Sequence, residues 1–152
     1  MKLLCPTYLI TVLFLLGMSS LHAQDLDKHR WENRVLIIKS NNGLEFDHYS
    51  YQLHVLDNDT AGMLERKLVV YLVNGDEYNF RDFKSSIQDT QWKPVGSRLE
   101  NLLDANKDFQ LVLMGLDGGV KLDRDTSIDQ KELFRIIDAM PMRASEMRKK
   151  KG

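Results

Sequence analysis

Two short, continuously apolar runs constrain the fold of this chain more than any other feature. They occupy residues 35–38 and 68–73, and both are rich in β-branched residues. A continuous run of this length predicts a strand that is covered on both faces, as in the centre of a sheet. Between the two runs, apolar residues recur at helical spacing over residues 45–56, which predicts an amphipathic helix. The pattern therefore indicates a parallel β-α-β unit with a right-handed crossover.

The last third of the chain predicts a hairpin followed by a helix. Residues 109–114 form a third apolar run, and residues 120–122 can return as a short antiparallel strand. Between them, the Asp-Gly-Gly sequence at 117–119 is typical of a tight turn. Apolar residues then recur at helical spacing between residues 128 and 140, which predicts the last helix.

The middle of the chain gives weaker signals. A short helix is expected from Ser97, with Ser97 as its N-cap and Glu100 completing a capping box. Residues 77–93 are polar with scattered aromatic residues, and their pattern favours neither a helix nor a strand. Trp92 and Pro94 suggest a loop that is anchored to the domain.

The resulting element order is β-α-β, α, β-β-α, which is the thioredoxin-like arrangement. It predicts an α/β fold in which a mixed four-stranded sheet carries helices on both faces. An α/β sandwich of another topology is the competing interpretation.

The first residues have the three-part layout of a secretory signal peptide. Lys2 gives a positive start, residues 3–18 are mostly apolar, and small residues up to Ala23 suit cleavage. We expect the mature chain to begin at Gln24. A membrane anchor is the alternative, but the apolar run is short for a spanning helix, which needs about 20 residues.

We expect three segments: a signal peptide over 1–23, one domain over 24–148 and a basic tail over 149–152. The product would be exported to the periplasm or the extracellular space, with no membrane span after cleavage of the signal. For the tail, a frayed and solvated terminus is favoured over a binding patch, because termini not tied to a fold are usually disordered.

Cysteine usage and charge exclude several classes of function. Cys5 is the only cysteine, so cleavage after Ala23 would leave no thiol for disulfide exchange or peroxidase chemistry. The formal net charge of −1 gives no basic excess, so no nucleic-acid partner is expected. The chain also lacks a phosphate loop, a dinucleotide fingerprint and the Gly-x-Ser-x-Gly pattern of esterases. We therefore predict no cofactor and no metal site.

Several short motifs resemble an uncharacterised domain family of exported bacterial proteins. They are Trp31-x-x-Arg34, Glu65-Arg66, the Asp-Gly-Gly-Val-Lys hairpin at 117–121, the Met-Pro-Met-Arg sequence at 140–143, and Glu146-Met147. The resemblance covers roughly residues 25–148. A related domain lies in sushi-repeat-containing extracellular proteins of animals and in a secreted coiled-coil matrix protein. The resemblance implies a thioredoxin-like fold, and no enzymatic activity is established for the family.

The Met140-Pro141-Met142-Arg143 stretch has a structural interpretation. Proline disfavours a helical Met140 and lacks an amide donor, so the last helix should stop near Asp138 or Met140 and a new turn should open at Pro141. We expect both methionines to point back to the sheet and fill gaps there. Arg143 should satisfy free carbonyls or pair with Asp138 or Glu146. Solvent exposure of Met142 would instead favour a partner-binding surface.

The leading functional hypothesis is an exported, non-catalytic thioredoxin-like domain that binds a protein or a glycan at the cell envelope. One alternative is a cysteine-independent enzyme that uses Asp, Lys and Arg side chains. The other is a purely structural adhesion module. The candidate binding or motif residues are Trp31, Arg34, Asp117, Lys121, Asp138, Met142 and Arg143.

Overall fold

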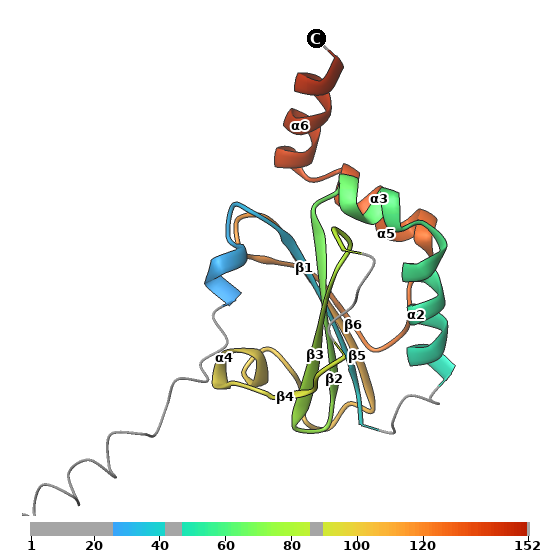
Figure 1. Cartoon of the computed structure of the whole chain (residues 1–152), viewed down its shortest axis with the longest axis vertical. Helices are drawn as coiled ribbons and strands as arrows, with labels where there is room; N and C mark the ends of the chain where they lie inside the picture. The colour runs from blue at the N-terminus through green and yellow to red at the C-terminus, as the bar shows by residue number, and fades with distance from the viewer. Residues whose placement is uncertain (1–25, 42–46, 86–89, 152) are drawn as a thin grey trace, which may run out of the picture.

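A single six-stranded mixed sheet forms the centre of the molecule (Figure 1). The computed structural model describes residues 26–41, 47–85 and 90–151. The strands lie in the order β4-β3-β2-β1-β5-β6. Their bounds are β1 Arg34–Ser40, β2 Leu68–Asn74, β3 Glu77–Asp82, β4 Lys93–Pro94, β5 Phe109–Met114 and β6 Val120–Arg124. The α/β class is as predicted.

The predicted β-α-β unit is confirmed at the centre of the sheet. Strands β1 and β2 pair in parallel, with Arg34 opposite Leu68 and Ser40 opposite Asn74. All seven residues of β1 are buried. The apolar run at 35–38 predicts this for its own four residues but not for Arg34, Lys39 and Ser40. The crossover contains the expected helix, α2 (Asp47–Asn58), and a further short helix, α3 (Thr60–Glu65).

The predicted hairpin and last helix are also present. Strand β5 pairs antiparallel with β1, and β6 pairs antiparallel with β5. Helix α5 (Gln130–Asp138) follows, with Asp129 as its N-cap accepting a hydrogen bond from the Glu132 amide at 2.8 Å.

The sheet is larger than the four strands that the sequence predicted. Residues 77–93, whose pattern favours neither a helix nor a strand, supply β3, which pairs antiparallel with β2, and the start of β4. Tyr78 and Phe80 alternate with polar residues along β3, which is the period of a strand, but charged residues at both ends of β3 dilute the signal. Pro94, expected in an anchored loop with Trp92, lies in β4, and Trp92 just before that strand is 36 % exposed.

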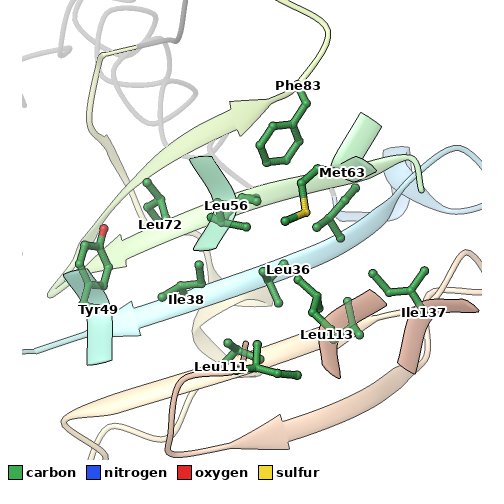
Figure 2. Packing of buried hydrophobic residues seen from close by; sticks show 14 of the residues in the cluster. Leu36, Ile38, Tyr49, Leu56, Met63, Leu72, Phe83, Leu111, Leu113 and Ile137 are labelled. Carbon is green, nitrogen blue, oxygen red and sulfur yellow. The ribbon is translucent and has the colours of Figure 1, made fainter. Parts of the chain in front are cut away.

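Helices cover both faces of the sheet (Figure 1). On one face, α2, α3 and α5 enclose the larger apolar core, in which Leu36, Ile38, Leu111 and Leu113 of the sheet meet helix residues (Figure 2). On the other face lie the 3-10 helix η1 (Leu26–His29) and the short α4 (Ser97–Glu100).

The predicted capping box of α4 does not form. Gly96 is the N-cap residue, Ser97 is already helical, and no side chain caps the helix. Leu99 is fully buried, so packing against the sheet, rather than capping, holds this short helix.

The chain ends in a helix that extends beyond the sheet. Helix α5 ends at Asp138, and α6 (Pro141–Lys151) begins at the proline, as predicted. In Figure 1, α6 starts close to α3 and α5 and projects away from the sheet, and Lys150 near its end still reaches Glu65 of α3. It runs across the expected domain boundary at 148 and into the expected basic tail.

The expected signal peptide, residues 1–23, lies outside the described residues. Among the helices of the described part, none has the length and apolar composition needed to cross a membrane.

Candidate functional site

The motif residues gather at one end of the sheet, which we call the motif edge (residues 30–34, 64–67, 114–121 and 138–146). Parallel pairing places the first residues of β1 and β2 side by side, and β5 ends opposite Val35. Strand β6 starts beside the end of β5. The junction between α5 and α6 lies above the start of β2, next to α3 (Figure 1). All seven candidate residues therefore belong to this edge.

Arg143 is buried at the motif edge and joins three elements. Its side chain is only 5 % exposed. Its Nε donates to Asp138 Oδ1 at 3.1 Å, and its Nη2 donates to Glu65 Oε1 at 3.1 Å. Its Nη1 donates to the Glu65 backbone carbonyl at 3.2 Å. The predicted pairing with Asp138 and the predicted carbonyl contact are present, although that carbonyl belongs to α3 rather than to α5.

Asp138, the last residue of α5, is shared by two arginines. Arg66 Nη2 donates to its Oδ2 at 2.6 Å, while Arg143 donates to its Oδ1. Partial burial acts to raise the pKa of Asp138, but these two hydrogen bonds outweigh it and leave that pKa below its usual value. Arg66 also lies over the Phe134 ring, 3.7 Å from its centroid, which fixes the guanidinium plane.

Arg34, the first residue of β1, is completely buried. Its Nη1 donates to the Arg66 carbonyl at 2.9 Å and to Glu146 Oε2 at 3.3 Å. Its Nε and Nη2 have no hydrogen-bond partner among the described residues. Burial lowers the pKa of Arg34, and the Glu146 carboxylate opposes that shift. This guanidinium is therefore held in an environment that only partly satisfies it.

Glu146 ties helix α6 to the sheet. Its carboxylate contacts Arg34, lies 3.6 Å from Arg143 Nη1 and lies 3.4 Å from Lys67 Nζ. With Glu65 and Asp138 it balances three arginines in a small volume. We call this group the arginine cluster; its members are Arg34, Arg66, Arg143, Glu65, Asp138 and Glu146.

Asp117 and Lys121 form a separate pair in the β5–β6 hairpin. Lys121 Nζ donates to Asp117 Oδ2 at 2.7 Å, and Asp117 Oδ1 accepts from the Gly119 amide at 3.1 Å. A Cβ on Gly115 would lie 2.6 Å from Lys121 Cε, so the pair also requires a glycine before the turn. The hydrogen bond from Lys121, followed by that from Gly119, lowers the pKa of Asp117. The Asp-Gly-Gly-Val-Lys motif thus stabilises its own turn.

Trp31 lies beside this hairpin with its ring directed to solvent. Its amide donates to the Leu116 carbonyl at 2.6 Å, and its side chain is 55 % exposed. Its backbone φ of 69° is in the left-handed region, which a bulky residue rarely adopts. The fold therefore keeps a large apolar ring outside the core at some conformational cost.

The two methionines beside Pro141 have different environments. Met140 is 8 % exposed and packs in the larger core, as predicted. Met142 is 40 % exposed, so the expectation that it points back to the sheet is wrong. Position 142 is one helical residue before buried Arg143, and because α6 leaves the sheet, only one side of this first turn faces the domain.

The charged groups of the motif edge are paired with one another. Each carboxylate of the arginine cluster is engaged by at least two cations. The residues considered for an enzyme, Asp117, Lys121, Asp138 and Arg143, form two separate ion pairs rather than one site. In the described part of the chain, no group of three or more His, Cys, Asp or Glu side chains is placed to hold a metal ion.

Arg66, Glu65 and Glu146 were part of the motifs but not of the candidate site residues. Their roles depend on partners far along the chain: Arg143 meets Glu65 across 78 positions, and Arg34 meets Glu146 across 112 positions.

The fold and this edge define a mixed α/β domain whose C-terminal helix is fixed by partly buried ion pairs. The chain belongs to the family described as Domain of unknown function (DUF4174), whose model matches residues 25–146. No curated protein and no solved structure matches the sequence.

Proposed function

We propose that this chain is an exported, non-catalytic thioredoxin-like domain that binds a protein at the cell envelope, in the periplasm or outside the cell. Removal of residues 1–23 would take away Cys5, the only cysteine, so the domain would have no thiol redox activity.

The strand arrangement supports the thioredoxin-like relationship. Strands β2, β1, β5 and β6 lie next to one another in that order, with β1 parallel to β2 and β5 antiparallel to β1. The β-α-β unit followed by a β-β-α unit produces this order in the thioredoxin-like arrangement. On this view β3 and β4 extend the common core from the outer side of β2.

Exposed apolar side chains at the motif edge carry the binding proposal. Among the described residues, the large hydrophobic side chains that are exposed at this edge are Trp31 at 55 %, Leu64 at 43 %, Val120 at 48 % and Met142 at 40 %. Exposed apolar residues that gather in one region are typical of a protein interface, whereas single ones are common everywhere. Methionine and tryptophan are both frequent in such interfaces.

The arginine cluster would give this surface a fixed shape. It orients α6 against β1 and α3 before any partner arrives, which reduces the entropy lost on binding. On this proposal Arg143 holds α6 in place, and Met142 beside it belongs to the binding surface.

A glycan remains the second candidate ligand because of a groove between α2 and α5. The groove has a volume of about 800 Å³ and includes Tyr51, whose ring is 47 % exposed. Its other lining residues are His54, Val55, Asn58, Asp129, Gln130, Lys131, Phe134, Arg135 and Asp138. An exposed aromatic ring beside amide and carboxylate groups suits a sugar ring, which offers an apolar face and hydroxyl groups.

Affinity capture with the native envelope fraction tests the proposal and separates its two forms. The exported chain should retain a protein that survives washing with soluble envelope glycans. If soluble glycans displace the retained material and Tyr51→Ala abolishes retention, the groove rather than the motif edge is the binding site. If the chain retains neither a protein nor a glycan, a structural adhesion module is the better interpretation. Turnover of an envelope substrate that depends on Asp117 or Asp138 would favour the enzyme.

A further inference from the structure

A second pocket lies at the end of the sheet opposite the motif edge. It is located at the carboxyl ends of the two parallel strands, β1 and β2, and has a volume of about 280 Å³. The lining residues are Lys39, Asn41, Val73, Gly75, Asp76, Val95, Glu100, Leu103 and Ala105. Ligands of α/β proteins commonly bind outside the carboxyl ends of strands. The size suits a small metabolite rather than a drug-sized molecule.

Lys39 is the unusual feature of this pocket. The residue is 4 % exposed, near the end of a fully buried strand. Its ammonium group donates to the backbone carbonyls of Asp104 and Lys107, the latter at 3.0 Å. An ammonium group has three N–H donors, so these two carbonyls leave one donor without a partner among the described residues. Among the described residues no carboxylate lies within ion-pair distance of it.

A buried cation without a contacting anion is costly, and such a group is usually paired. Burial lowers the pKa of Lys39, although Asp104 and Asp108 partly oppose this through their negative charges. A carboxylate entering the pocket would restore the preference for the charged form. Binding of an anion should therefore relieve an electrostatic cost that the free protein carries.

The wall that holds Lys39 is well ordered by hydrogen bonds. Asn41 Nδ2 donates to the Lys107 carbonyl at 3.1 Å, and the Asp104 amide donates to Gln110 Oε1 at 2.7 Å. Gln110 in turn donates to Asp123 Oδ1 at 3.0 Å. The loop between α4 and β5 is thus fixed from both sides, and the ammonium position is preset.

The rest of the lining determines which kind of carboxylate fits. Val73, Val95 and Leu103 supply apolar walls. Asp76 and Glu100 are exposed residues that add two negative charges to the lining, which disfavours a simple anion. A ligand with a carboxylate, an ammonium group and an apolar side chain satisfies all three features. Gly75, at φ 61°, leaves open space in front of its backbone.

We propose that this pocket binds a free α-amino acid with an apolar side chain, whose carboxylate contacts Lys39 and whose ammonium group faces Asp76 and Glu100. The inference is independent of the protein-binding function proposed for the motif edge. It assigns a small-molecule site to the opposite end of the same sheet.

Calorimetric titration of the full chain with three related compounds tests the ligand class. L-leucine carries both charges, 4-methylpentanoate lacks the ammonium group, and 3-methylbutylamine lacks the carboxylate. We expect L-leucine to bind at least about tenfold more tightly than either analogue, since each lost charged contact is worth a factor of this order. Equal binding of 4-methylpentanoate would overturn the role of the acidic residues. Absence of saturable L-leucine binding would overturn the site.

Matched substitutions locate the site. Lys39→Met should weaken L-leucine binding by about tenfold or more. Lys107→Met should leave it unchanged, because the Lys107 side chain is directed to Asp123, 3.5 Å away, and only its backbone carbonyl contacts Lys39. Equal loss in both variants would contradict the assignment.

Glu100→Gln provides a test that does not disturb the core. Glu100 is exposed, so this variant should fold normally. It should weaken L-leucine binding and strengthen that of 4-methylpentanoate. Unchanged binding of both compounds would overturn the proposal even if Lys39→Met failed to fold. Amide NMR signals of Val73 and Val95 should shift with L-leucine in the unmodified chain, and shifts confined to other regions would also contradict it.

Discussion

Arg143 and Asp138 form an ion pair across Pro141, with Nε 3.1 Å from Oδ1. The proline ends one helix and starts the next, and the arginine behind it reaches back to the last residue of α5. The same arginine also contacts Glu65 at the end of α3. One side chain therefore fixes the angle at which the C-terminal helix leaves the domain.

Truncation of this side chain should loosen the C-terminus. Because Arg143 is buried and makes charged hydrogen bonds, Arg143→Ala should lower the free energy of unfolding by more than about 1 kcal/mol. Arg148→Ala, on the exposed part of α6, should change it by less than about 0.5 kcal/mol. Urea unfolding of both variants measures the difference. If Arg143→Ala unfolds like the unmodified chain yet loses its partner, the arginine belongs to the binding surface.

Acid should weaken the same cluster. The pKa of Asp138 is held below its usual value by Arg66 and Arg143 against the effect of burial, and hydrogen bonds from Lys150 and Arg143 lower that of Glu65. A depressed carboxyl pKa contributes stability that is present above the unfolded-state pKa of about 4 and is lost as the pH falls through the folded-state value. Stability should therefore decline below about pH 4.

Asp138→Asn tests this assignment of the acid response. The variant should be less stable at neutral pH and should show a shallower decline between about pH 5 and pH 2. Asp125→Asn serves as the control, because that exposed carboxylate makes no ion pair with another described residue. Chemical unfolding over a pH series provides the measurement, and parallel curves for Asp138→Asn and the unmodified chain would contradict the account.

Two tyrosines of the core should respond oppositely to loss of their hydroxyl groups. The Tyr49 hydroxyl is buried with no partner among the described residues, and burial raises the pKa of Tyr49 to about 12. Tyr49→Phe should raise the free energy of unfolding by about 1 kcal/mol, since it removes an unsatisfied buried group. The Tyr71 hydroxyl lies 2.9 Å from His29 Nε2, so Tyr71→Phe should lower the free energy of unfolding by about 1–3 kcal/mol. Urea unfolding of both variants measures the difference. A larger loss of stability in Tyr49→Phe than in Tyr71→Phe would contradict the prediction.

Export leads to a separate prediction about the N-terminus. Protein isolated from its native host should begin near Gln24, because the small residues up to Ala23 follow an apolar run that starts after Lys2. N-terminal sequencing determines this directly. Recovery of the chain in the membrane fraction with residues 1–23 intact would show that the segment is an anchor.

The parts of the fold that were predictable have strong local patterns. Strands β1 and β2 are continuous apolar runs, and the break at Pro141 follows from proline chemistry. Strand β3 was not predicted because it is only partly buried, so its alternation is diluted by charged residues.

The candidate site was predictable only in part, because its contacts are long-range. The pairing of Arg143 with Asp138 is local and was expected, whereas its bond to Glu65 depends on how α3 and α6 meet. The exposure of Met142 likewise depends on α6 leaving the sheet, which no local pattern indicates. No local pattern marks Lys39 as buried, since a lysine within a strand is usually directed to solvent.

The most direct measurement of the central claim compares two exposed side chains on rival surfaces. Met142 on α6 is 40 % exposed at the motif edge, and Tyr51 on α2 is 47 % exposed in the groove. Each would be replaced by aspartate, which adds a charge that an interface must desolvate. The amount of envelope protein captured by each variant would be compared with that of the unmodified chain. The account predicts a loss of at least about tenfold for Met142→Asp and full capture by Tyr51→Asp. Full capture by Met142→Asp, in a chain that folds normally, would contradict it.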